Sequence, residues 1–147
     1  MDSREIFQVG QWLLFNKGTC FGKKKDHLGI IVGIDKVANI IGIAVNASSQ
    51  VDEIKAFAQH NQIDIGKTIV TIDPTDIRAS HHVSKRTSFD CNRPASISFD
   101  DIEEWFSEGL VKLVDYNVEV NKQLLVELKS GIWESPMVEQ KYKDILV

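Results

Sequence analysis

The sequence has few cysteines and none of the spacings that hold a structural metal. Its two cysteines, Cys20 and Cys91, are too few for a disulfide framework, and we expect both to be free thiols. A zinc site completed by His81 and His82 is disfavoured because no C-x2-C spacing accompanies these residues. The sequence therefore predicts neither a metal ion nor a cofactor.

Long apolar runs are also missing. No stretch approaches the roughly 18 apolar residues that a membrane span requires. Residues 1–5 are polar, and no apolar segment of a secretory signal follows them. We therefore expect a cytoplasmic protein without membrane contact.

An excess of positive charge is absent as well. The formal net charge of the 147 residues is −4. Residues 1–93 contain 12 Lys or Arg against 10 Asp or Glu, whereas residues 94–147 contain 5 against 11. A phosphate-bearing partner would prefer the first part, and the acidic second part argues against nucleic acid wrapping the whole surface.

What the first part does contain is a series of apolar segments bounded by Gly, Asn or Asp. Such segments, rich in Ile, Val and aromatic residues, are typical of strands. Some of these segments are separated by a predicted hairpin connection over 35–39 and a predicted helix over 51–60. Residues 63–65 are predicted to form a strand fragment. The predicted strands cover 8–15, 27–34, 40–46, 68–72 and 83–91.

The second part is helical in pattern. Ser98 followed by Asp101 resembles a capping box, and Gly109 is placed to end the helix that starts there. A short strand over 110–114 follows, and the apolar spacing of 118–132 predicts the clearest helix. Ser135 and Pro136 predict the start of a last helix.

These elements predict one α+β domain over residues 1–147. The first part, about 8–93, forms a small and strongly bent antiparallel sheet or barrel. The second part, 94–147, supplies helices that pack on one side of it. Composition agrees, since 43% hydrophobic and 26% charged residues are ordinary for a globular domain.

A cationic loop and a hydroxyl pair lie at the ends of neighbouring predicted strands. The loop, residues 18–27, contains Lys23, Lys24 and Lys25, and the third strand closes on Ser48 and Ser49. Positive charge beside hydroxyl donors suits a phosphodiester. Each residue also has a plainer reading, because lysine runs are commonly solvated and Ser48–Ser49 would cap the helix over 51–60.

The order of these segments resembles the MazF/PemK-type toxins of bacterial toxin–antitoxin modules. The similarity runs from residue 8 to about residue 132, and its order and spacing carry more weight than any one motif. The matching segments are Gly10–Leu14, His27–Val32, Ser48–Ser49, Val83–Cys91 and Ile97–Ser98. The resemblance implies an SH3-like antiparallel barrel with C-terminal helices packed on one side.

The resemblance also implies a sequence-selective, metal-independent endoribonuclease that cleaves single-stranded RNA by 2′-hydroxyl attack and leaves a cyclic phosphate. Such chemistry needs a base, an acid and a cation near the phosphate. The expected catalytic residues are His27, Ser48 and Asp90, where Asp90 orients His27 or reads a base edge. The expected RNA-binding residues are Lys24, Lys25, Ser49, Arg86 and Ser88. A homodimer and an antitoxin protein are the implied partners.

The sequence departs from the family pattern at several positions. His27 stands where the family has arginine, and Leu28 where it has proline. The segment 51–66 is longer than a compact barrel needs, and residues 133–147 extend beyond the minimal pattern. An alternative is therefore a non-catalytic PemK-like barrel that binds nucleic acid or a protein. A third reading makes the 118–132 helix a contact surface for a partner.

Overall fold

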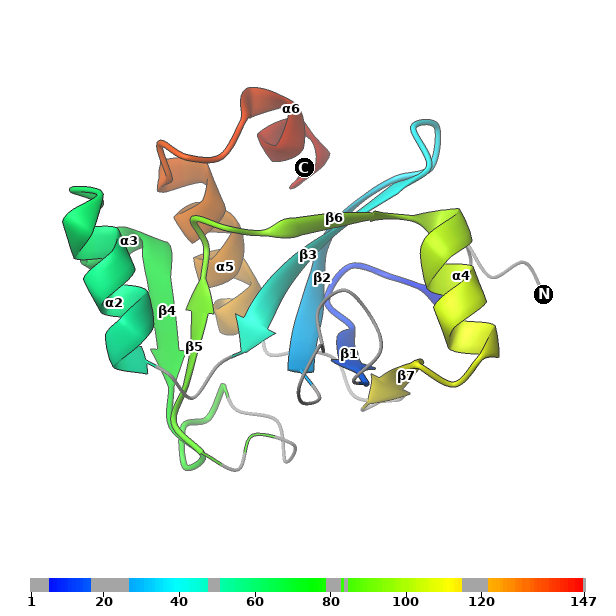
Figure 1. The fold of residues 1–147 in the computed structure, drawn as a ribbon, viewed down its shortest axis with the longest axis horizontal. Coiled ribbons are helices and arrows are strands. Elements are labelled where there is room, and N and C mark those ends of the chain that lie inside the picture. Colours follow the sequence, from blue (N-terminus) through cyan, green and yellow to red (C-terminus); the bar gives the residue numbers. More distant parts are fainter. Residues whose placement is uncertain are drawn as a thin grey trace.

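A computed structural model describes residues 6–16, 27–47, 51–78, 83, 85–114 and 122–146. The fold is α+β, as the sequence predicts, with an antiparallel sheet and several helices (Figure 1). The strands are β1 (Trp12–Phe15), β2 (His27–Asp35), β3 (Ile40–Ala47), β4 (Ile69–Ile72), β5 (Thr87–Asp90), β6 (Ala95–Ser98) and β7 (Val111–Val114). The helices are α2 (Val51–His60), α3 (Ile65–Thr68), α4 (Phe99–Ser107), α5 (Lys122–Glu134) and α6 (Gln140–Lys143), followed by a 3-10 turn, η1 (Asp144–Leu146).

The main sheet has five antiparallel strands in the order β6-β3-β2-β1-β7. Its centre is the β2–β3 hairpin, whose turn is held by Asp35 accepting from the backbone N–H groups of Val37 and Ala38. The β2–β3 register shifts twice, and such irregularities bend a sheet. Within the described residues the sheet stays open, with β6 and β7 as its edges, so barrel closure is not observed.

A second ribbon, β4 paired with β5, lies beside β3. Helices α2 and α3 lie against this ribbon at the end of the molecule opposite α4 (Figure 1). They bury a small cluster of their own, which consists of Ile54, Ala58, Ile63 and Ile69. The segment 51–66 is therefore a packed helical layer and not an open loop.

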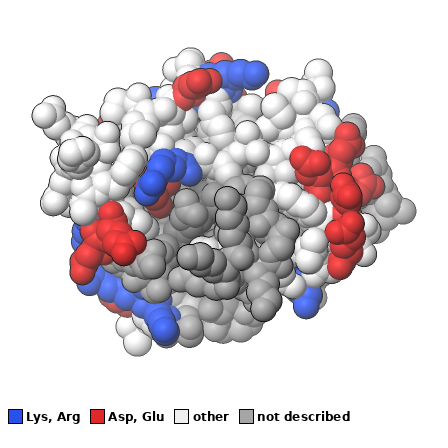
Figure 2. All heavy atoms as spheres, in the orientation of Figure 1, with Lys and Arg blue, Asp and Glu red and all other residues white. Residues whose placement is uncertain are grey.

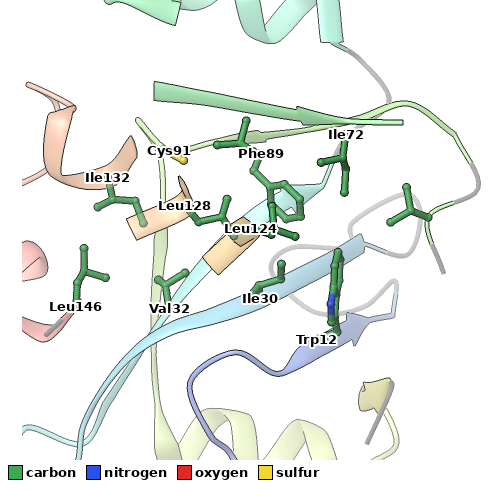
Figure 3. Close-up of a cluster of buried hydrophobic side chains, with 12 residues drawn as sticks. Trp12, Ile30, Val32, Ile72, Phe89, Cys91, Leu124, Leu128, Ile132 and Leu146 are labelled. Atoms are coloured by element: carbon green, nitrogen blue, oxygen red, sulfur yellow. The ribbon is translucent and has the colours of Figure 1, made fainter. Parts of the chain in front are cut away.

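Strand β2 is buried on both faces of the sheet. Ile30 and Val32 point to one face, where they meet Leu124, Leu128 and Ile132 of α5 (Figure 3). Side chains alternate along a strand, so Ile31 points to the other face and joins a second cluster built around α4. This double burial explains why β2 is a nearly continuous apolar run.

The C-terminal segment closes tightly over the β2–β3 hairpin. A Cβ built on Gly33 would lie 2.5 Å from the carbonyl oxygen of Ile145 in η1, and one on Gly42 would lie 2.9 Å from Cδ1 of Ile145. Tyr142 donates a 2.7 Å hydrogen bond to the carbonyl oxygen of Ala95, and burial raises the pKa of its hydroxyl. Leu146 is buried in the same cluster as β2 and α5.

Several predicted elements match the structure. The helix over 51–60 and the strands around 27–35 and 40–47 are confirmed. Ser98 caps α4 as expected, since its hydroxyl accepts from the backbone N–H of Asp101 at 3.1 Å. Gly109 follows that helix with φ of 75°, a conformation that favours glycine.

Other element predictions are wrong. Residues 63–65 form no strand in the structure. Asp64 instead caps a short helix, because its carboxylate accepts a hydrogen bond from the backbone N–H of Gly66. The last helix begins at Gln140 and not at Ser135. The first and fifth predicted strands are shorter than expected, and β6 was not predicted. Of the predicted helix over 118–132, residues 118–121 lie outside the described residues.

No helix in the described part of the chain is long and apolar enough to cross a membrane.

Candidate functional site

Of the predicted site residues that the structure describes, His27 begins β2 of the main sheet, whereas Ser88 and Asp90 lie in β5 of the second ribbon and Arg86 precedes it. His27 pairs with Phe15 of β1, and its neighbour Leu28 pairs with Ala47, the last residue of β3. The described chain therefore enters β2 and leaves β3 at the same end of the sheet. Four predicted site residues lie outside the described residues: Lys24, Lys25, Ser48 and Ser49.

Asp90, at the end of β5, is buried and has partners on both carboxylate oxygens. Its side chain is 1% exposed. Oδ1 accepts from the backbone N–H of Asn92 at 3.0 Å, and Oδ2 accepts from Nε of Arg93 at 2.7 Å. These contacts hold the turn that follows β5, so the described role of Asp90 is to fix this turn and Arg93.

Arg93 combines this ion pair with an aromatic contact. Its guanidinium carbon lies 3.9 Å from the centre of the Phe57 ring, which α2 supplies. The Arg93 side chain is 45% exposed, and within the described residues only its Nε has a hydrogen-bond partner. The guanidinium plane is thus held by two neighbours, and its two Nη atoms have no hydrogen-bond partner among the described residues.

Ser88 and Arg86 occupy contrasting positions on the same segment. Ser88 is fully buried in β5, where its hydroxyl lies 2.7 Å from that of Thr71 on the paired strand. Arg86 precedes the strand, is 58% exposed and, among the described residues, has a distant ion pair of 3.8 Å with Asp73 as its one ionic contact. Of these two predicted RNA-binding residues, Arg86 is therefore the accessible one.

A buried chain of hydrogen bonds continues from the turn after β5. The Asn92 amide donates to Thr68 Oγ1 at 3.0 Å and accepts from Ser135 Oγ at 2.7 Å. Lys143 donates to the Ser135 carbonyl oxygen at 3.0 Å. This network joins α3, the turn after β5 and the end of α5, and its buried polar groups are satisfied within the protein.

A groove of about 550 Å³ runs between β4 and α5. Arg78 lies in it and donates to Asp76, Glu127 and the carbonyl oxygen of Thr71. The hydrogen bonds from Arg78 lower the pKa of Asp76 to about 2, and those with the two carboxylates raise the pKa of Arg78. Arg78 is therefore already compensated by anionic partners, whereas Lys67, which also lines the groove, has no ion pair among the described residues.

The charged side chains are unevenly spread over the surface. The acidic side chains of α4 form a strip on the right of the face in Figure 2. The members of this strip are exposed carboxylates: Asp100, Asp101, Glu103, Glu104 and Glu108. An RNA strand would be repelled from α4, whereas around α2 and β5 the exposed carboxylates Asp52 and Glu53 are accompanied by the cations Lys55, Arg86 and Arg93.

No three His, Cys, Asp or Glu side chains gather to hold a metal ion in the part of the chain that the structure describes. Cys20, His81 and His82 lie outside that part. Cys91 is a buried free thiol. Burial, with a smaller contribution from the Asp90 carboxylate, raises the pKa of Cys91 to about 12.

No family model, curated protein or solved structure matches the chain. Functional inference therefore depends on the residues themselves. Arg93 is not singled out in the sequence analysis, although Asp90, an acidic residue three positions before it, is at a spacing that allows a local ion pair. Its contact with Phe57 has no such signal, because the two residues meet only through the packing of α2 on β5.

Proposed function

We propose that the protein is a metal-independent endoribonuclease that cleaves single-stranded RNA at the end of the sheet where β2 begins and β3 ends. The observation that carries this proposal is the pairing of Leu28 with Ala47. It puts Leu28, which follows His27 in the chain, beside Ala47, which precedes Ser48 in the chain. A titratable imidazole, cations and hydroxyl groups are the groups that phosphodiester cleavage requires.

In the proposed reaction, the RNA 2′-oxygen attacks the neighbouring phosphorus and the 5′-oxygen leaves, which produces a cyclic phosphate. His27 acts as acid or base in the two proton transfers. Lys24, Lys25 and Arg86 compensate the charge of the phosphorane, and Ser48 or Ser49 donates to a nonbridging oxygen. The catalytic role of Asp90 stays a prediction. In the structure the Asp90 carboxylate contacts Asn92 and Arg93.

A relation to the MazF/PemK-type toxins, with their SH3-like barrel, belongs to the same proposal. It is supported by the order of the matching segments, by the β1–β2–β3 meander and by the bulged β2–β3 pair. We accordingly propose a cytoplasmic toxin that acts as a homodimer and is blocked by an antitoxin protein.

The test is cleavage of a long single-stranded RNA in EDTA, followed by analysis of the new ends. Wild type should leave cyclic phosphates, and His27→Ala should lose this activity. His60→Ala is the matched control, because His60 is an exposed histidine at the end of α2. Thermal unfolding of each variant separates a chemical effect from a folding defect.

Two results would contradict different parts of the proposal. Equal cleavage by wild type and His27→Ala would remove His27 from the mechanism and keep the nuclease. An absence of cleavage by folded wild type would reject the nuclease itself.

The second candidate is a non-catalytic PemK-like barrel that binds nucleic acid or a protein partner. The observation that favours it is the engagement of Asp90 and Ser88, whose side chains are buried and bonded within the fold. RNA binding by wild type without cleavage, unaffected by EDTA or added divalent ions, would select this candidate.

A further inference from the structure

Arg93 is an arginine held at the surface by an ion pair and an aromatic ring, with most of its hydrogen-bonding capacity unused by the described residues. A guanidinium has five N–H donors. Asp90 takes the Nε donor, and Phe57 covers the guanidinium at 3.9 Å. The four N–H donors on the two Nη atoms have no partner within the described residues, and 45% of the side chain is exposed.

This arrangement suits an anion. An unrestrained arginine loses side-chain freedom when it binds, and here Asp90 and Phe57 have already fixed the plane. The Nη fork of a fixed guanidinium matches two oxygens of a phosphate. Arg78, which is the contrasting case, has its donors directed at Asp76, Glu127 and a backbone carbonyl.

The position of Arg93 fits an RNA strand that leaves the proposed cleavage site. Helix α2 begins three residues after Ser48, and Phe57 lies six residues into it, about 9 Å along the axis at 1.5 Å per residue. Helix α2 therefore connects the end of β3 with Arg93. The acidic strip on α4 lies at the opposite end of the molecule (Figures 1 and 2).

We propose that Arg93, positioned by Asp90 and Phe57, binds a backbone phosphate of the single-stranded RNA outside the site of cleavage. This inference rests on the proposed function, since it assigns a further contact to the same substrate. It also gives Asp90 a role as a positioning residue for Arg93. The rival role for Arg93 is that of a counterion for buried Asp90 and nothing more.

The experiment measures binding of a fluorescein-labelled 2′-O-methyl RNA of about 20 nucleotides, a length that exceeds common single-strand site sizes. This probe cannot undergo 2′-hydroxyl attack, so binding is measured without cleavage. The test variant is Asp90→Asn with Arg93→Gln, which removes the ion pair without leaving a buried carboxylate unpaired. Affinity is measured by anisotropy at several salt concentrations.

The matched control is Lys141→Gln with Asp144→Asn. These two residues are exposed on the C-terminal segment, have the same three-residue spacing and also leave the net charge unchanged. The control should bind like wild type. The test variant should bind about tenfold more weakly at low salt, and its slope of log affinity against log salt should fall by about 0.7, the value for one lost phosphate contact on a single strand.

Two charge-preserving variants test whether the fixed guanidinium plane matters for binding. Arg93→Lys keeps the charge and loses the fork of two Nη atoms. Phe57→Leu keeps the charge and loses the stacked ring, and it should weaken binding about two- to fivefold with little change in salt slope. If the double variant does not fold, as judged by thermal unfolding, these two variants decide the question.

The outcomes separate the two proposals. If the test variant matches its control in affinity and slope while wild type cleaves RNA, Arg93 is only a counterion and the proposed function stands. If folded wild type neither binds the probe nor cleaves RNA, both proposals fail. Weaker binding together with a reduced slope in the test variant alone supports the phosphate contact.

Discussion

Gly33→Ala should destabilise the protein because β2 and the C-terminal segment touch at this residue. The new methyl carbon would lie 2.5 Å from the carbonyl oxygen of Ile145 and 3.0 Å from its carbonyl carbon. Both are backbone atoms, which cannot move aside without displacing η1. Alanine in a strand is otherwise favoured over glycine by about 0.5–1 kcal/mol, so a loss of stability would be a clear sign of the close contact.

The size of the effect follows from two costs. Overpacking costs about 1–3 kcal/mol, and displacing η1 instead would expose Leu146, which contributes about 1.5–3 kcal/mol when fully buried. Less the gain from alanine, the free energy of unfolding should fall by about 1–2 kcal/mol. For a chain of 147 residues this lowers Tm by about 2–8 °C, measured by scanning calorimetry.

Two comparisons sharpen this test. Gly42→Ala, on the paired strand, would meet Cδ1 of Ile145 and the Tyr142 hydroxyl, which are the ends of side chains, so its cost should be smaller. In a chain truncated after Lys143, Gly33→Ala should cost nothing. An unchanged or higher Tm for Gly33→Ala in the full chain would refute the reasoning.

Three further predictions concern other parts of the fold. Leu128→Ala should lower the free energy of unfolding by about 2–5 kcal/mol in urea titrations, because Leu128 is fully buried between α5 and the sheet. Ser98→Ala should cost about 1 kcal/mol by the same measurement, since the hydroxyl that caps Asp101 N–H is lost, whereas Ser98→Asp should retain most of the stability. The pKa of Asp76 is depressed to about 2 in the folded protein. The stabilising contact of Asp76 with Arg78 is therefore fully present above the unfolded pKa of 3.8 and is lost as the pH falls towards 2. Asp76→Asn should flatten the dependence of stability on pH in this range, and an unchanged profile would contradict the assignment.

The sequence predicts elements best where local pattern and tertiary packing agree. Strands β2 and β3 follow from apolar runs bounded by polar turns, and α2 follows from its apolar face. Strand β6 escaped prediction because only Ile97 of its four residues is buried. Its strand character comes from pairing with β3, which is distant in the chain.

Ser135 shows how a tertiary partner overrides a local signal. Followed by proline, it predicts a helix cap, and its hydroxyl does accept from the backbone N–H of Met137 at 3.2 Å, but it also donates to the side-chain oxygen of Asn92 at 2.7 Å. The chain turns there, and α6 begins at Gln140 instead. A pattern of adjacent residues contains no information about a partner that arrives from the turn after β5.

The candidate site likewise combines contacts that a sequence can predict with contacts that it cannot. The meeting of β2 and β3 at Leu28 and Ala47 follows from a hairpin, which sequence can predict. The capture of Asp90 by Arg93 depends on a local turn, and the contact of Arg93 with Phe57 depends on how α2 packs. The family resemblance predicts a catalytic role for Asp90, which stays a prediction, whereas the described contacts tie Asp90 to Arg93.

The small cluster under α2 and α3 has a consequence for the motions of the protein. Helix α2 buries Ile54 and Ala58 in this cluster, whereas α3 is also held by α5 and by the hydrogen bond from Asn92 to Thr68. With so few buried contacts, α2 should open without unfolding the rest, so its amide protons should exchange with solvent faster than those of β2. Phe57 moves with α2, so the ring stacked on Arg93 would separate from it in each such opening and return when the helix closes.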